Sequence, residues 1–293
     1  MNRTEEILRN FMAKHGLPAA FADAAHQHYL PLAKTLDHLR ERLGRPLVAG
    51  IHGCQGSGKS TLAELLTAWL AQVHGRRCVA LSIDDFYLTR EQRRELAERV
   101  HPLFITRGVP GTHDTALLDR TLDALTLASG TVAIPRFDKI TGDRQPEHEW
   151  PRTRTPVDIV ILEGWCLGVQ PQDPAALMSP INRLEAEEDP DGRWRQYVND
   201  CLRTDYLPLW ERIDYWTMLA APSFDCVFEW RMEAERGLRA QGNGQHLMDE
   251  TAMQRFIEHY QRLTEHALAT LPPHMDQLIR LDEQRCVQSS SKP

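Results

Sequence analysis

A glycine-rich loop between a short apolar run and a helical pattern constrains this chain more than any other feature. The apolar run, residues 47–51, has the length of a buried strand, and residues 59–73 after the loop show helical periodicity. The loop satisfies G-x-x-x-x-G-K-[ST]. Glycines let backbone N–H groups turn inward around phosphates, and the helix N-terminus adds its positive dipole end. The pattern predicts a nucleotide-binding P-loop formed by Gly53, Cys54, Gln55, Gly56, Ser57, Gly58, Lys59, Ser60 and Thr61.

Two side chains of this loop carry chemistry beyond the backbone cradle. Lys59 is expected to reach the β- and γ-phosphates of ATP, and the Ser60 hydroxyl is placed for Mg²⁺. Only five of the 34 basic residues are lysines, so a lysine at this position is informative. The alternative interpretation, a merely flexible glycine-rich turn, does not explain the strand before the loop or the helix after it.

Carboxylates follow two further apolar runs. Residues 78–83 end in Asp84 and Asp85, and residues 157–162 end in Glu163. The carboxyl ends of parallel strands face one crevice, so these acids are expected beside the P-loop. One of Asp84 and Asp85 can take or orient the proton of an attacking hydroxyl, while the other helps to hold Mg²⁺ or the loop. Glu163 has the position of a Walker B acid beside Mg²⁺. The alternative for the Asp pair is a helix N-cap or a solvated turn.

Two charged loops supply candidate substrate contacts. One spans residues 107–114 and the other residues 135–144, and both adjoin predicted core elements. Arginine forks bind carboxylates and phosphates bidentately, which singles out Arg107 and Arg144. Loops with Gly, Pro and paired charges are also common on ordinary surfaces. The full set of candidate substrate residues is Asp85, Tyr87, Arg107, His113, Asp114, Arg136, Lys139 and Arg144.

Composition excludes several classes of protein. The net charge of -7 argues against a nucleic-acid binder, which needs a basic face. The longest uninterrupted apolar stretch, residues 159–162, is far shorter than the ~20 residues of a membrane span. The six cysteines are scattered without a CxxC unit, and the N-terminal residues show no export signal. We therefore expect a cytoplasmic protein, monomeric or homodimeric, that acts on a small molecule.

Strands alternating with helices predict an α/β fold of the P-loop NTPase type, a parallel sheet with helices on both faces. Residues 1–45 form an N-terminal helical extension, and residues 46–288 the main domain. Within that domain we predict strands at 131–134, 224–230 and 278–281, and a helix at 194–216. Residues 168–192, with four prolines, are expected to form an irregular insertion, and residues 289–293 a disordered tail.

The order of the motifs resembles P-loop kinases related to uridine kinase, pantothenate kinase and phosphoribulokinase. Within that group the chain most closely resembles the D-glycerate 3-kinase family. The motifs that carry this are SIDDFYLT at 82–89, RGVPGTHD at 107–114 and FDKITGDR at 137–144. The resemblance implies that Asp84 is the base, that Glu163 serves Mg²⁺ and that Arg144 serves substrate or phosphate. The predicted catalytic residues are then Asp84, Lys59 and Arg144, and the predicted metal ligands are Ser60, Glu163 and Asp84.

The reading that follows is an ATP- and Mg²⁺-dependent small-molecule kinase, with D-glycerate as acceptor and 3-phosphoglycerate as product. A related kinase acting on another polyol, a pantothenate-like acid or a nucleoside is the first alternative. An ATP-binding switch that serves a protein partner is the second. A switch needs no acceptor pocket, so the two charged loops favour an enzyme.

Overall fold

The structure is a computed structural model that describes residues 3–240 and 250–291. Its centre is a six-stranded sheet in the order β10-β9-β8-β1-β7-β2. All neighbouring strands run parallel except β10, which pairs antiparallel with β9. The six strands are β1 (Leu47–Gly53), β2 (Cys78–Ser82), β7 (Ile159–Gly164), β8 (Tyr215–Ala220), β9 (Gln277–Leu281) and β10 (Val287–Ser291).

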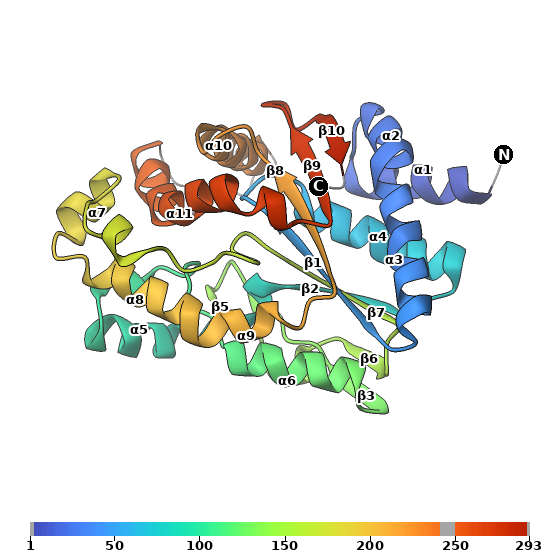
Figure 1. Cartoon of the computed structure of the whole chain (residues 1–293), viewed down its shortest axis with the longest axis horizontal. Coiled ribbons are helices and arrows are strands. Elements are labelled where there is room, and N and C mark those ends of the chain that lie inside the picture. Colours follow the sequence, from blue (N-terminus) through green and yellow to red (C-terminus); the bar gives the residue numbers. More distant parts are fainter. Residues whose placement is uncertain (1–2, 241–249, 292–293) are drawn as a thin grey trace.

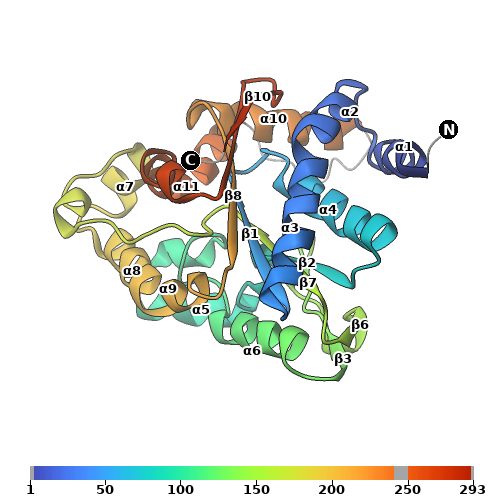
Figure 2. The ribbon, with the colours of Figure 1, turned by 45° about the vertical axis from the view of Figure 1, so that its right-hand side comes forward.

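Helices cover both faces of this sheet, as predicted (Figures 1 and 2). Along β1 the side chains alternate, so that Leu47, Ala49 and Ile51 enter one buried cluster and Val48 enters the other. On the Val48 face pack α5 (Arg90–Arg99), α6 (Thr115–Thr126), α8 (Arg193–Cys201) and α9 (Leu207–Trp210). On the opposite face pack α1 (Arg3–His15), α3 (Leu30–Leu43), α4 (Lys59–His74) and α10 (Asp225–Ala240). The helix α11 (Glu250–Thr270) contributes to both clusters.

The N-terminal helices complete one face of the sheet. α1 carries the buried residues Leu8 and Phe11 and α3 carries Leu36, while the short α2 (Ala20–Ala24) has no buried residue. These side chains belong to the same cluster as Leu66 of α4 and Ile51 of β1. The helical pattern predicted for this region is therefore present, and it is built into the core of the sheet domain. α3 ends where Gly44 takes a left-handed φ of 64°, which glycine adopts without strain.

Two elements were predicted with the wrong secondary structure. Residues 224–230, expected as a strand, begin the helix α10, with Val227 and Trp230 buried on one side of it. The sheet instead contains the strand β8, which was not predicted. Its first residues fall within the helix predicted over 194–216. That helical region ends at Trp210, after α8, a π-helical turn and α9.

The C-terminal segment also differs from the expectation of a disordered tail. Residues 289–291 belong to β10, which closes the edge of the sheet by pairing Ser290 with Ile279 and Ser291 with Leu278. Residues 292–293 lie outside the described residues. Backbone hydrogen bonds to β9 order this polar segment although it offers few apolar side chains.

Two small antiparallel sheets stand apart from the main one. β3 (Gly130–Ala133) pairs with β6 (Arg152–Thr155), so the strand expected near 131–134 exists but does not join the central sheet. β4 (Phe137–Asp138) pairs with β5 (Asp143–Arg144) and forms a hairpin within the second charged loop. This hairpin matters for the site described below.

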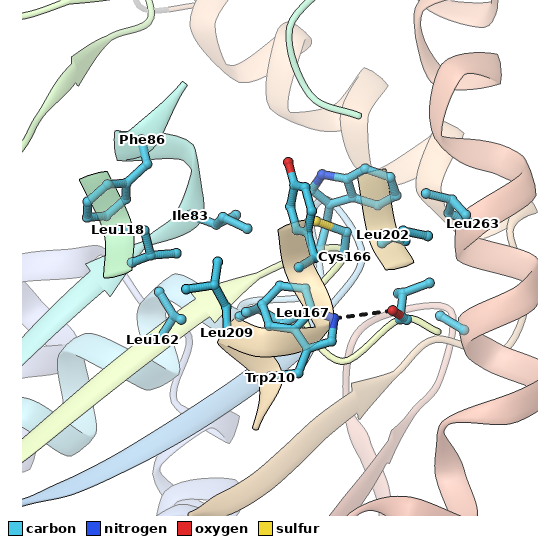
Figure 3. Packing of buried hydrophobic residues seen from close by; sticks show 14 of the residues in the cluster. Ile83, Phe86, Leu118, Leu162, Cys166, Leu167, Leu202, Leu209, Trp210 and Leu263 are labelled. Atoms are coloured by element: carbon cyan, nitrogen blue, oxygen red, sulfur yellow. Dashed lines mark hydrogen bonds between the residues drawn. The ribbon is translucent and has the colours of Figure 1, made fainter. Parts of the chain in front are cut away.

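The segment 168–192 is more ordered than an irregular insertion. It contains a 3₁₀ turn (Pro174–Leu177) and the helix α7 (Arg183–Glu188). It is held to α11 by a buried ion pair, in which Arg262 Nη2 lies 2.6 Å from Glu185 Oε2. At its start, Trp210 Nε1 donates to the Val169 carbonyl at 3.2 Å within the buried cluster of Figure 3.

Within residues 3–240 and 250–291, no helix has the combination of length and apolarity that crossing a membrane requires.

Candidate active site

The P-loop follows the central strand β1 and leads into α4, whose first residue is Lys59. Gly56 and Gly58 have φ values of 84° and 87°, a left-handed conformation that glycine takes readily. A Cβ on Gly56 would lie 2.6 Å from Cβ of Trp230, so the loop also packs directly against α10. The sequence thus places backbone N–H groups and the N-terminus of a 16-residue helix where a phosphate can bind.

Ser60 and Glu163 meet at the start of α4. The Ser60 hydroxyl donates a hydrogen bond of 2.7 Å to Glu163 Oε1, at the end of β7. Glu163 Oε2 is buried without a hydrogen-bond partner and lies 4.0 Å from Lys59 Nζ. A hydroxyl and a carboxylate with a buried open oxygen are the donors that Mg²⁺ prefers, so these residues fit that ion.

Asp84 lies on the short 3₁₀ helix η2 (Ile83–Phe86) that follows β2. Its Oδ1 accepts a 2.7 Å hydrogen bond from the Tyr87 hydroxyl, and its Oδ2 a 2.8 Å bond from Lys139 Nζ. Burial acts to raise the pKa of Asp84, but the charges of Lys139 and Lys59 outweigh it and lower the pKa to about 2. Asp84 is therefore an ionised carboxylate within the electrostatic reach of the P-loop lysine.

Asp85 has a different task from its neighbour. Its Oδ2 accepts from Arg136 Nη1 at 3.0 Å and its Oδ1 from the backbone N–H of Phe137 at 3.2 Å. Burial raises the pKa of Asp85, against the opposing effect of Arg136. These bonds fasten the first strand of the β4–β5 hairpin to η2, so both oxygens of Asp85 hold the hairpin in place.

Arg107 lies beside that hairpin. Its guanidinium carbon lies 5.3 Å from the centre of the Phe137 ring, and its Nη2 donates to the Lys139 carbonyl at 3.3 Å. The backbone around Arg107 is clamped from two sides. The Tyr260 hydroxyl donates to the Arg107 carbonyl at 2.9 Å, and Trp165 Nε1 donates to the Gly108 carbonyl at 3.0 Å. The Arg107 guanidinium is thus a cation on a backbone that these hydrogen bonds hold in place.

Arg144 is held more tightly than we expected of a substrate ligand. Its Nη2 donates to the Tyr87 carbonyl at 2.9 Å and to Asp114 Oδ2 at 3.3 Å, and its side chain is largely buried. Asp114 caps α6 by accepting from the Leu117 N–H at 2.9 Å. These contacts tie the hairpin to the loop 107–114.

His113 and Tyr87 form the aromatic wall next to Asp84. Their rings stack with centroids 4.7 Å apart, and His113 Nδ1 lies 2.6 Å from the Tyr206 hydroxyl. Burial lowers the pKa of His113 to about 4, so the imidazole is neutral at physiological pH. Its Nε2 is buried and has no hydrogen-bond partner.

The candidate residues therefore lie on the P-loop, just after β2, at the end of β7 and on the two charged loops. These two charged loops contact one another. Tyr260 and Tyr206 could not be predicted as site residues, because each lies in an ordinary helical pattern far from the motifs. Trp165 directly follows Glu163 and Gly164, and that adjacency was the one available signal. Trp230 was missed because its segment was assigned to a strand.

The fold and the site together define the class of protein. The central strands are parallel, the P-loop follows β1, an acid stands at the end of β7, and two further loops lie beside Asp84. This combination is that of a P-loop kinase. Comparison with known proteins supports this class, although no family model matches the chain. An uncharacterized kinase of Schizosaccharomyces pombe, mug58, is 36% identical over 271 residues, covering 87% of this chain and 94% of that protein. The chain belongs to the same family of kinases as that protein.

Two relatives named D-glycerate 3-kinase bear out the resemblance predicted from the motifs. The chloroplastic D-glycerate 3-kinase of Arabidopsis thaliana is 32% identical over 225 residues, covering 73% of this chain and 46% of that protein. The chain thus aligns with about half of the plant protein's length. The solved structure of D-glycerate 3-kinase from Cryptococcus neoformans superposes with a TM-score of 0.76 at 25% identity. This match covers 91% of this chain and 99% of that one.

Proposed function

We propose that this protein transfers the γ-phosphoryl group of ATP to the primary hydroxyl of D-glycerate and releases 3-phosphoglycerate and ADP. The observation that carries this proposal is a carboxylate and a guanidinium that are linked through one residue, Lys139. Asp84 is bonded to Lys139, and the backbone of Lys139 is bonded to Arg107. A hydroxy acid offers a hydroxyl to the first group and a carboxylate to the last.

The nucleotide side of the site uses the P-loop. Residues 53–61 would cradle the phosphates, with Lys59 on the β- and γ-phosphates. Ser60 and Glu163 would hold Mg²⁺, a fit supported by the buried open oxygen of Glu163. When bound, Mg²⁺ supplies positive charge that offsets the charge on the phosphates.

The acceptor side uses Asp84 and Arg107. Asp84 would orient the acceptor hydroxyl and take its proton as the phosphoryl group is transferred. A pKa of about 2 makes a weak base, but the loose transition state of phosphoryl transfer asks for little more than a positioned acceptor. Arg107 would meet the acceptor carboxylate.

Arg144 fits a supporting role better than the acceptor or transition-state role we first expected of it. Its Nη2 already has two partners, and both belong to the loops that enclose the site. We propose that Arg144 holds Tyr87 and Asp114 in place, while the neutral ring of His113 lines the acceptor space.

The test is ADP release, measured by a coupled assay with ATP and a panel of acceptors. The panel holds D-glycerate, L-glycerate, glycerol, pantothenate, uridine and cytidine. We expect D-glycerate to give the largest kcat/KM and glycerol a poor one, because glycerol leaves the Arg107 cation unpaired. Preference for a nucleoside or pantothenate would replace the proposed acceptor. ADP release that no acceptor stimulates would favour a switch protein.

We also propose that the protein works in a reducing compartment such as the cytoplasm. All six cysteines lie among the described residues as free thiols. The expectation of a monomer or homodimer stays a prediction, which size-exclusion chromatography with light scattering checks.

A further inference from the structure

Both oxygens of Asp84 are already bonded by side chains of the protein. Oδ1 accepts from the Tyr87 hydroxyl at 2.7 Å, and Oδ2 accepts from Lys139 Nζ at 2.8 Å. An acceptor hydroxyl, or a water molecule, must reach one of these oxygens before Asp84 can take its proton. A carboxylate oxygen can accept a second hydrogen bond, but an incoming hydroxyl competes with the protein partner at the oxygen it approaches, and transfer of its proton to that oxygen is favoured once the partner leaves.

The two partners differ in their freedom to leave. Tyr87 is 4% exposed and its ring is stacked on His113, so its hydroxyl is fixed by packing. The Lys139 side chain is 65% exposed, and moving its ammonium group away from Asp84 requires no change in the core. The exchangeable position is thus Oδ2, where Lys139 binds.

The backbone of Lys139 is fixed even though its side chain is exposed. The Lys139 carbonyl accepts from Arg107 Nη2, and the next N–H, that of Ile140, donates to Asp138 Oδ1 at 2.8 Å. The β4–β5 hairpin that carries Lys139 is fastened to Asp85. The ammonium can therefore swing off Asp84 and return to the same place.

We propose that Lys139 guards Asp84 against water: its ammonium group occupies the acceptor position on Oδ2 until an acceptor hydroxyl displaces it. Its function is to suppress wasteful hydrolysis of ATP when the nucleotide is bound and the acceptor is absent. This inference depends on the proposed role of Asp84 as base, and it does not depend on which acceptor the enzyme uses.

The reaction that Lys139 prevents can be written with its atoms balanced. A water oxygen forms a bond to the γ-phosphorus of ATP, and the bond between that phosphorus and the oxygen bridging to the β-phosphate breaks. The water proton passes to Asp84 Oδ2, and the products are ADP and inorganic phosphate. The same base that serves the acceptor serves water, so excluding water at Oδ2 decides between transfer and hydrolysis.

The contact between Arg107 and Lys139 explains how an acceptor displaces the Lys139 ammonium group from Asp84. Arg107, the proposed partner of the acceptor carboxylate, is bonded to the carbonyl of Lys139. An acid that binds Arg107 would arrive next to the residue whose side chain it must replace. Acceptor binding and removal of the ammonium group from Asp84 are thereby joined in one step.

The experiment measures ADP formation with ATP and Mg²⁺ and without any acceptor. Lys139→Met removes the ammonium and keeps the length of the side chain. Lys139→Arg keeps a cation, and Ile140→Ala, at a neighbour that is 92% exposed, is the matched control. We expect Lys139→Met to raise acceptor-independent hydrolysis on the order of tenfold, a small part of what a positioned base supplies. Lys139→Arg should raise hydrolysis less than Lys139→Met does, because it keeps a cation, and Ile140→Ala should stay near the wild type.

A double variant, Asp84→Asn with Lys139→Met, identifies the base involved. It should return hydrolysis to the wild-type level, because the water then has no carboxylate to activate it. Hydrolysis that is unchanged or lower in Lys139→Met overturns the inference, as does an elevated rate that the double variant retains. Binding of a fluorescent ATP analogue and the thermal unfolding midpoint of each variant show that it is folded and loaded with nucleotide. If glycerate does not stimulate ADP release by the wild-type enzyme, the proposed acceptor is wrong. The test of Lys139 remains valid, because it uses no acceptor.

Discussion

The Ser60 hydroxyl donates a 2.7 Å hydrogen bond to Glu163 Oε1, and so joins the first turn of α4 to the end of β7. These residues lie 103 positions apart in the sequence. The other oxygen of Glu163 is buried, lacks a hydrogen-bond partner and faces Lys59 Nζ at 4.0 Å. A buried carboxylate oxygen without a hydrogen bond is costly, and a bound cation would satisfy it.

Glu163→Gln should therefore weaken the response of the enzyme to Mg²⁺. The amide keeps the size of the side chain but loses the charge that a cation needs. We expect the Mg²⁺ concentration for half-maximal activity to rise on the order of tenfold, as when a group that orients a metal ligand is lost. The measurement is initial rate against Mg²⁺ at fixed ATP, with the exposed Glu147→Gln as control. An unchanged Mg²⁺ dependence would remove Glu163 from the metal site.

Asp84→Asn should lower kcat by roughly a hundredfold, the loss expected for a positioned base, with little change in the KM for ATP. Asp85→Asn is the matched comparison, because it alters the adjacent carboxylate. Asp85 binds Arg136 and the Phe137 N–H, so its variant should loosen the hairpin and lower the unfolding midpoint. Steady-state kinetics on both variants separate the two roles. A silent Asp84 beside a kinetically sensitive Asp85 would reverse the assignment.

Arg107→Lys should raise the KM for glycerate clearly while the KM for ATP moves less. The substitution keeps the charge but loses the fork that binds a carboxylate bidentately. Arg144→Lys is the comparison, since that guanidinium binds Tyr87 and Asp114 inside the protein. Its variant should mainly lower the unfolding midpoint. The measurement is initial rate against acceptor and against ATP. A selective effect of Arg107→Lys on ATP would move this arginine to the phosphate side.

The stability of the protein should fall as the pH drops from about 6.5 to about 4. Burial lowers the pKa of each of His52, His113 and His259 to about 4, from 6.5 in the unfolded chain. Between these values the unfolded chain binds protons that the folded chain does not, so acid favours unfolding and the stability is fully present above pH 6.5. Urea unfolding from pH 7.5 to 4.5 measures this slope. His259→Gln, away from the proposed chemistry, should make it shallower; an identical slope would contradict the buried-histidine explanation.

The sequence predicts the centre of the fold well because its signals are local. Residues 47–51 are a continuous apolar run that leads into a glycine motif, and β1 and its loop form there. Residues 224–230 illustrate the limit. Their apolar residues suit a short buried strand. Cys226, Val227 and Trp230 also share one face of a helix, so the sequence is compatible with both the strand period and the helical period.

The predicted site residues do come from loops that the fold brings together, but their individual roles were not readable from the sequence. Arg107 and Arg144 look alike as arginines in charged loops. Arg144 is occupied by Asp114 and Tyr87, and Arg107 lies over Phe137 instead. This difference depends on the contact between two loops that lie some 30 residues apart in the sequence. No local sequence pattern encodes that contact. The same holds for Tyr260, whose hydroxyl reaches Arg107 from α11.

The transfer of label from γ-labelled ATP to glycerate shows directly whether this protein is a glycerate kinase. The enzyme is incubated with labelled ATP, Mg²⁺ and D-glycerate, the products are separated, and Lys59→Ala serves as the inactive control. We predict that the wild type places the label on the primary hydroxyl of glycerate, giving 3-phosphoglycerate, and that the control variant, still folded, transfers none. Label found only in inorganic phosphate, or transferred equally well by the Lys59 variant, would contradict the account.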